Sequence, residues 1–325
     1  MDPFEIILLD IDGAVLKQKG LLDLHHPTVI SLQEKAESLR FWCRIFEIES
    51  IKIIIDQSAH SNKRKLFFYG SGDYHHLAYL GISLIKEPFC LIQFDNHTDI
   101  WKPLKKGFID FGSWVPRVFQ FGNLKKVIQL GVDGDLRLAW YLPFPLGRHS
   151  HEIDLLCLGR VEIYPNKMRR SLLLGRYNGC LSSVKFLPNR FTTRLEWKNI
   201  NDNGGMEVFI HQLLSTIPTE GIYITIDKDV LRESDNFAGY PMRQGSLTLD
   251  DLAIALSVLA KNKRILGADI CGDGSYLRTA SSIAKRLMIW QMTWAIPASK
   301  FTAEETIQRN EVSNLRIIEE ISQTQ

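Results

Sequence analysis

The sequence lacks the features that define several large classes of protein. It has five cysteines among 325 residues, and none of them form the short paired spacings of a zinc ribbon or a disulfide framework. No apolar run approaches the ~18 residues that a membrane-spanning helix needs. The acidic start, Met1-Asp2-Pro3-Phe4-Glu5, does not match a signal peptide. We therefore expect a cytoplasmic protein with no membrane partner.

The sequence also lacks an excess of charge of either sign. Lys and Arg total 39 and Asp and Glu total 37, and the longest basic run is Lys63-Arg64-Lys65. This balance gives no general attraction to nucleic acid, so a small-molecule substrate is expected instead. The hydrophobic content of 45% is ordinary for a globular protein. No linker rich in Gly, Ser or Pro divides the chain, which favours one domain spanning residues 1–325.

Short apolar runs alternate in places with helical patterns, which predicts an α/β protein. The expected strands are Ile6–Leu9, Lys52–Ile55, Leu66–Tyr69, Leu91–Phe94, Val127–Leu130, Val161–Tyr164, Ile222–Ile226 and Ile265–Ile270. Continuous apolar runs are typical of parallel strands covered on both faces, so we predict a three-layer α/β/α fold with a mostly parallel central sheet. The clearest helices are Asp250–Leu259, with Thr248 as N-cap, and Ser281–Trp294.

Candidate metal ligands follow one of these apolar runs. Asp95, His97 and Asp99 occupy alternate positions, and alternate residues of an extended chain face the same side. A carboxylate, an imidazole and a second carboxylate suit Mn²⁺, Fe²⁺, Zn²⁺ or Ni²⁺ better than Ca²⁺. The segment therefore predicts a metal site, with a polar strand end as the competing interpretation.

Two further segments place candidate ligands after apolar runs. Asp227 and Asp229 close one run, and the glycine-rich segment Gly70–His76 ends in His75 and His76. In an open α/β sheet, ligands gather beyond the carboxyl ends of parallel strands. Side chains that are far apart in the sequence are therefore expected to converge at one edge of the sheet.

In this order, the three segments resemble the metal motifs of the ureohydrolase superfamily, which includes arginases, agmatinases and formiminoglutamases. The resemblance covers roughly residues 65–290 and implies an arginase-like fold with a binuclear metal centre. It favours His75 over His76 as a ligand, and it leaves residues 1–60 as a divergent N-terminal elaboration. Because members of the family often form trimers or hexamers, a homo-oligomer is an open expectation.

Two positions depart from the guanidine-hydrolysing members of that family. Those enzymes recognise the substrate cation with a glutamate where this chain has Gly272, followed by Asp273. Arginases also carry a shuttle histidine where this chain has Asp110–Trp114. We therefore expect weak or no urea release from arginine or agmatine. An amide, amidine or formimino substrate is as consistent with the sequence, and Arg148 and Arg243 are candidates to meet a carboxylate on it.

The candidate ligands suffice for two metal ions that share carboxylates and a water molecule. Such a pair generates hydroxide near neutral pH, so together with the resemblance we expect hydrolysis of a small-molecule C–N bond by a metal-bridging hydroxide. Carboxylates outnumber imidazoles, which favours manganese. Asp99 is expected to serve catalysis as well, and His149 and His151 are candidate proton shuttles. The expected metal ligands are His75 or His76, Asp95, His97, Asp99, Asp227 and Asp229.

Two other interpretations stay open. The chain can have this fold and bind metal or a ligand without catalysis. Alternatively, the segment Ile6–Val15 resembles the first motif of haloacid dehalogenase-like phosphatases, which implies Asp10 as nucleophile and Asp12 as acid and base. The phosphatase interpretation leaves the other aspartates and histidines unexplained. A strand end followed by a turn at Gly13 is the simpler account of this segment.

Overall fold

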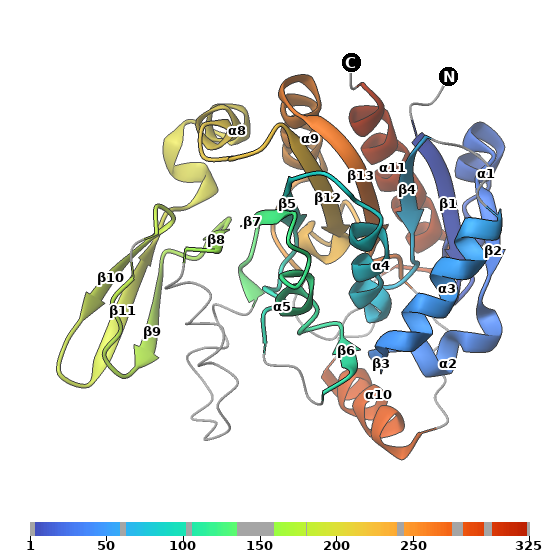
Figure 1. Ribbon diagram of the computed structural model, residues 1–325, viewed down its shortest axis with the longest axis horizontal. Coiled ribbons are helices and arrows are strands. Elements are labelled where there is room, and N and C mark those ends of the chain that lie inside the picture. Colours follow the sequence, from blue (N-terminus) through green and yellow to red (C-terminus); the bar gives the residue numbers. More distant parts are fainter. Residues whose placement is uncertain are drawn as a thin grey trace.

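A parallel β-sheet forms the centre of the molecule in the computed structural model (Figure 1). The structure describes residues 4–58, 63–101, 106–134, 159–179, 181–238, 244–274, 282–295 and 301–323. Within these ranges eight strands form the sheet, and every neighbouring pair is parallel. In spatial order they are β2 (Thr28–Ser31), β1 (Phe4–Asp10), β4 (Arg64–Phe68), β13 (Arg264–Cys271), β12 (Gly221–Asp227), β5 (Phe89–Phe94), β7 (Leu124–Leu130) and β8 (Val161–Tyr164).

Helices cover both faces of this sheet, which confirms the predicted three-layer α/β/α architecture (Figure 1). Successive strand residues point to opposite faces, so β1 sends Ile7 and Leu9 into one apolar core and Ile6 and Leu8 into the other. The first core is covered by α3 (Ile45–Ser58), α4 (Ala78–Ser83) and α5 (Val115–Val118). The second is covered by α1 (Lys19–His25), α8 (Met206–Leu214), α9 (Leu249–Asn262) and α11 (Ala303–Ser322).

The predicted strand at Lys52–Ile55 is wrong, because these residues lie within α3. Its apolar run reads as a strand in isolation, but Ile48, Ile51 and Ile55 recur at helical spacing and are the buried residues of the helix. The other seven predicted strands coincide with strands of the main sheet to within three residues at their ends.

The predicted helices are confirmed. Helix α9 begins after Thr248, whose hydroxyl accepts a hydrogen bond from the Asp251 amide at 3.0 Å, as an N-cap does. The second predicted helix is α10 (Ile283–Ala295). The C-terminal helix α11 starts with a capping box between Thr302 and Glu305. Its apolar face packs into the second core, so it covers the sheet as well as ending the chain.

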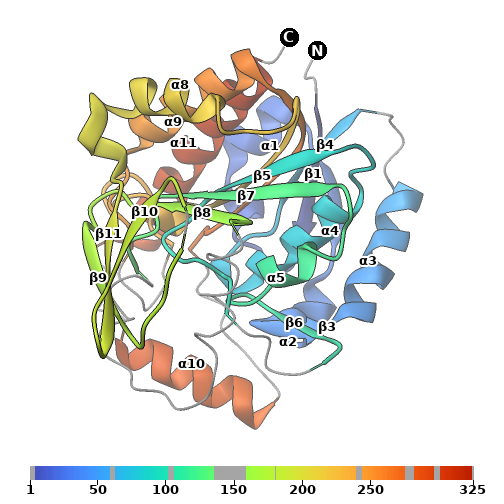
Figure 2. The same ribbon diagram turned by 60° about the vertical axis from the view of Figure 1, so that its left-hand side comes forward.

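Two small antiparallel sheets complete the described structure. One pairs β3 (Trp42–Arg44) with β6 (Phe108–Asp110). The other joins β9 (Arg170–Leu174), β10 (Val184–Pro188) and β11 (Thr192–Trp197) and lies beside the edge strand β8 (Figure 2). A short helix, α2 (Ala36–Leu39), precedes β3. None of the described helices is long and apolar enough to cross a membrane.

Candidate metal centre

The carboxyl-terminal edge of the main sheet brings together residues from three of its strands. Asp95 follows β5, Asp227 ends β12, and the two strands are neighbours with Phe94 paired to Ile226. His75 lies in a 3-10 helix, Gly72–Leu77, that follows β4. Since all of these strands are parallel, their ends meet at one edge. Six of the predicted ligands converge there: His75, Asp95, His97, Asp99, Asp227 and Asp229.

One group of donor atoms is centred on His75. Its Nδ1 atom lies 2.9 Å from Asp99 Oδ2, 3.2 Å from Asp95 Oδ2 and 3.8 Å from Asp227 Oδ2. Burial lowers the pKa of His75, but its hydrogen bonds to Asp95 and Asp99 outweigh burial and raise the pKa well above the ordinary value. In the absence of a metal ion, a proton on His75 thus compensates part of the surrounding negative charge.

A second group is centred on His97, whose Nδ1 atom lies 2.9 Å from Asp229 Oδ2 and 3.6 Å from Asp95 Oδ1. Asp95 therefore belongs to both groups, with one carboxylate oxygen toward His75 and the other toward His97. A carboxylate in this position is able to bridge two cations. The two groups provide oxygen and nitrogen donors, as first-row divalent metals require.

The carboxylates crowd together in a way that a cation would relieve. Burial and the charge of Asp229 and Asp95 raise the pKa of Asp227 well above its ordinary value. Burial and the charge of Asp95 likewise raise the pKa of Asp99 to about 7. Like charges in a buried site repel strongly because water does not screen them. The donor set and this crowding both fit a pair of divalent metal ions.

Two glycines leave the room that the Asp227 carboxylate occupies. A Cβ atom at Gly72 would lie 2.7 Å from Asp227 Oδ2, and one at Gly272 would lie 2.5 Å from Oδ1. Gly272 also has a φ of +88°, which other residues rarely adopt. Asp99 has a φ of +51°, so the backbone is strained at a candidate ligand position. The surrounding chain holds these ligands in place at a conformational cost.

Side chains behind the ligands fix the orientation of two of the carboxylates. Trp114 Nε1 donates a hydrogen bond to Asp99 Oδ2 at 2.6 Å. Gln93 Nε2 donates to Asp95 Oδ2 at 2.7 Å. These roles were not predicted from the sequence, although Gln93 precedes Asp95 by two residues and so lies on the same face of its strand.

A similar hydrogen-bond chain supports His75 from behind. Its Nε2 atom lies 3.0 Å from Thr225 Oγ1, and the Thr225 hydroxyl donates to Asp269 Oδ1 at 2.7 Å. This arrangement leaves Nδ1 of His75 facing the carboxylates. Partners of this kind usually determine the tautomer and basicity of a histidine ligand. Thr225 and Asp269 are direct neighbours in the pairing of β12 with β13, a relation that the sequence does not display.

Of the remaining predicted histidines, the structure describes His76. His76 is fully buried but belongs to none of the donor groups among the described residues, and burial lowers its pKa to about 3. His149 and His151 lie outside the described residues, as do Arg148 and Arg243. Their expected roles stay predictions.

Cys271 is a further neighbour of the site and was not predicted from the sequence. It ends β13 opposite Asp227, and its sulfur forms a possible donor group with His75 and Asp227. Burial and the charge of Asp227 raise the pKa of the Cys271 thiol well above its ordinary value. The thiol is therefore protonated near neutral pH in the metal-free protein, and is a weak ligand in that form.

The Asp10 and Asp12 side chains stabilise turns. Asp10 accepts hydrogen bonds from the Gly13 amide at 3.1 Å and from Gln33 Nε2 at 2.6 Å. Asp12 accepts hydrogen bonds from the amides of Ala14 at 3.1 Å and Ser71 at 3.2 Å. Neither aspartate belongs to a donor group within the part of the chain that the structure describes. This geometry favours the turn interpretation over the phosphatase interpretation.

Asp273 is committed to an ion pair inside the protein. Its Oδ1 atom lies 2.9 Å from Lys228 Nζ, and both side chains are completely buried. Gln18 Nε2 and Asn314 Nδ2 donate to the same oxygen at 2.7 and 3.1 Å. This carboxylate therefore does not present itself to a substrate in place of the family's glutamate.

No known protein-family profile matches the chain. A Thermotoga maritima protein described as uncharacterized is 26% identical over 273 residues, which are 84% of this chain and 81% of that protein.

Solved structures of ureohydrolases share the fold. Formimidoylglutamase from Bacillus subtilis has a TM-score of 0.55 and 14% identity, with 98% of this chain and 87% of that chain covered. Arginase from Bacillus caldovelox has a TM-score of 0.55 and 15% identity, with 98% of both chains covered. Trypanosoma cruzi formiminoglutamase with Mn²⁺ has a TM-score of 0.51 and 10% identity, with 99% and 95% covered.

The architecture and the comparisons together define the class of fold. It is a three-layer α/β/α fold of the arginase type. The sequence resemblance to the ureohydrolase superfamily is thereby confirmed at the level of the fold. The low identities make this chain a divergent representative of that fold.

Proposed function

We propose that this chain is a binuclear metal-dependent hydrolase that acts on a C–N bond of a small molecule. The observation that carries the proposal is the position of Asp95 between the His75 group and the His97 group. A shared carboxylate is what a two-metal site needs in order to hold its ions close together. The likeness of the fold to formimidoylglutamase and arginase supports the type of reaction.

When bound, the two metal ions would supply a water molecule of lowered pKa and a positive field for the developing oxyanion. The chain's own groups organise the site around them. Trp114 orients Asp99, and the Thr225 hydroxyl orients His75. We propose that Asp99, held by Trp114, serves catalysis as well as metal binding, with His149 and His151 as further candidates for proton transfer.

We propose manganese as the metal. Four carboxylates and two imidazoles make an oxygen-rich donor set, which suits Mn²⁺ better than a thiolate-binding metal. The structure of Trypanosoma cruzi formiminoglutamase, which carries Mn²⁺, supports this choice.

For the substrate, we propose an amide, amidine or formimino compound in preference to arginine or agmatine. Gly272 stands where guanidine-hydrolysing enzymes carry their recognition glutamate, and a Cβ atom there would lie 2.6 Å from the Lys228 amide nitrogen. The neighbouring carboxylate of Asp273 is neutralised by Lys228. Cation recognition by a carboxylate at this place is therefore not supported.

The test is a measurement of bound transition metal per chain, paired with turnover of formimino, amidine, amide and guanidino substrates by the manganese-loaded protein. We expect two metal ions per chain and turnover, with loss of metal in Asp99→Ala and Asp227→Ala. The exposed Asp56→Ala variant is the control and should keep its metal. Metal without turnover of any substrate would favour the non-catalytic interpretation, and full metal occupancy in both site variants would place the centre elsewhere.

A further inference from the structure

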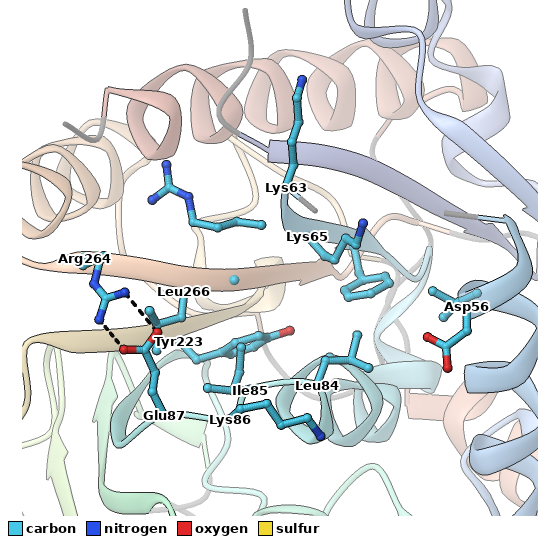
Figure 3. Close-up of a pocket in the computed structure, with 15 residues that line it drawn as sticks. Asp56, Lys63, Lys65, Leu84, Ile85, Lys86, Glu87, Tyr223, Arg264 and Leu266 are labelled. Carbon is cyan, nitrogen blue, oxygen red and sulfur yellow. Dashed lines mark hydrogen bonds and ion pairs between the residues drawn. The ribbon is translucent and has the colours of Figure 1, made fainter. Parts of the chain in front are cut away.

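A cavity of about 540 Å³ opens at the amino-terminal edge of the main sheet, opposite the metal centre (Figure 3). Its walls come from the end of α3, the first residues of β4, the end of α4 and the neighbouring strands β12 and β13. The proposed hydrolysis uses none of these residues. The volume falls within the ~300–1,000 Å³ that is usual for small-molecule sites.

Positive charge dominates the rim of this cavity. Five cationic side chains line it against two acidic ones, and one of the five, Lys65, is also paired with Glu5 of β1 outside the lining. One acid, Glu87, is held by Arg264, whose Nη1 atom donates to it at 3.0 Å. The other, Asp56, lies on α3 across the cavity (Figure 3). The cationic side chains are those of Lys63, Arg64, Lys65, Lys86 and Arg264.

Two of these cations repel one another. Burial lowers the pKa of Arg64, and the nearby charge of Arg264 lowers it further. Arg64 stays in place because its Nη1 donates to the Ile265 carbonyl at 2.9 Å and its guanidinium lies 4.6 Å from the centre of the Phe4 ring. An anion bound between the two guanidinium groups would reduce this repulsion.

The floor of the cavity is apolar and closely packed. The rings of Phe67 and Tyr223 lie at its base, with Leu84, Ile85 and Leu266 around them. Tyr223 fits there because two of its neighbours are glycines. A Cβ atom at Gly81 would lie 2.0 Å from the Tyr223 hydroxyl oxygen, and one at Gly267 would lie 3.0 Å from the ring atom Cε2. The aromatic floor is therefore built into the packing of α4 and β13.

We propose that this cavity binds a small organic anion that carries one or two phosphate or carboxylate groups on an apolar or aromatic body. Guanidinium and ammonium groups at the rim would bind the anionic groups by charge-assisted hydrogen bonds. The aromatic and aliphatic floor would hold the remainder of the molecule. Such a site is separate from the metal centre and independent of the proposed hydrolysis.

The experiment is calorimetric titration of the full-length protein with AMP and phenyl phosphate as probes. Adenosine and inorganic phosphate serve as the uncharged and the purely anionic comparisons. EDTA is present throughout, so that phosphate oxygens do not bind through a metal. We expect AMP or phenyl phosphate to bind at least about tenfold more tightly than either comparison, because each comparison lacks one of the two kinds of contact.

Two variants localise the binding. Lys63→Glu combined with Lys86→Glu should weaken binding of the tighter probe by at least about tenfold, since two cations become anions at the rim. Lys125→Glu makes the same kind of change at an exposed residue of β7 outside the cavity and should leave binding nearly unchanged. Thermal unfolding confirms that each variant is folded. Failure of both probes to bind at millimolar concentration, or equal weakening in the Lys125→Glu variant, would overturn the proposal.

Discussion

The two edges of the main sheet carry opposite charges in opposite surroundings. At the carboxyl-terminal edge, Asp95, Asp99 and Asp227 are between 1 and 6% exposed. At the amino-terminal edge, the charged groups around the cavity reach water, and the Arg264 side chain is 57% exposed. The same strands therefore begin at a hydrated basic surface and end in a buried acidic cluster.

This difference determines what each edge requires. Two charges interact several times more strongly in a protein interior than in water, so buried carboxylates at close range need a cation or a proton between them. Exposed cations are screened by water and salt and can remain side by side at little cost. The acidic edge is thus suited to a firmly held metal pair, and the basic edge to a ligand that exchanges with solvent.

The largest effect is expected from Asp95→Asn. This change keeps the shape of the side chain but removes the charge that both donor groups share, so the variant should lose both metal ions and the activity that depends on them. Asp229 belongs to the His97 group alone, so the Asp229→Asn variant should lose mainly one ion. Metal analysis of the purified proteins distinguishes the two variants. Retention of two ions by Asp95→Asn would show that its carboxylate does not bridge.

The next largest effect concerns the buried ion pair of Lys228 and Asp273. Lys228→Met should reduce the free energy of unfolding by roughly 3–5 kcal/mol, because a buried carboxylate loses its compensating charge. Urea unfolding measures the loss. The double variant Lys228→Met with Asp273→Leu should recover much of it, since no uncompensated charge remains. A single variant as stable as the natural chain would mean that water or another cation reaches Asp273.

The pH dependence of the metal-free protein tests the crowding of the carboxylates. The pKa of Asp99 rises from 3.8 to about 7, chiefly through burial. An acid with a raised pKa holds its proton more tightly in the folded state, so folded stability falls as pH rises from about 4 to about 7. The raised pKa values of Asp227 and Asp229 act in the same direction. Asp95, whose pKa is lowered, affects stability only at more acidic pH.

His76, whose pKa is lowered to about 3, takes up a proton on unfolding below about pH 6.5 and so opposes this trend there. In EDTA, we therefore expect the unfolding temperature to fall by a few degrees between pH 6.5 and pH 8, where the raised pKa values of His75, Asp99 and Asp227 act without that opposition. With manganese bound, the ionised carboxylates are stabilised and the fall should be absent. A metal-free protein that gains stability over this range would show that the carboxylates do not repel one another as the structure indicates.

The sequence predicted which side chains gather at this edge because their signals are local. Asp95, His97 and Asp99 follow a single strand at alternate positions, and Asp227 and Asp229 follow another. Parallel strand ends converge by topology, so the motifs and the fold class together were sufficient to anticipate the cluster. The failure at Lys52–Ile55 has a physical reason as well. Four apolar or amphipathic residues fit either periodicity, and only packing against the sheet selects the helix.

The supporting side chains were not predicted because their roles depend on contacts between distant segments. Thr225 on β12 meets Asp269 because β13 is the neighbouring strand, and it meets His75 because β4, which precedes His75, lies on the other side of β13. Trp114 reaches Asp99 from 15 residues further along the chain. The basic cavity was not predicted for a similar reason, since the short run Lys63–Lys65 is joined there by Lys86 and by Arg264, which lies about 200 residues further along the chain.

The smallest effect on the free energy of unfolding is expected at the amino-terminal edge. Arg264 and Glu87 form an ion pair whose side chains are 57 and 43% exposed. Because water already solvates both groups, Arg264→Ala should reduce the free energy of unfolding by no more than about 1 kcal/mol, and less in high salt. Urea unfolding at low and high salt, beside Lys228→Met as the buried counterpart, measures this difference. A loss as large as that of Lys228→Met would mean that the basic edge depends on its charges for folding as much as the acidic edge does. The two edges would then differ only in the chemistry of the ligands that they bind.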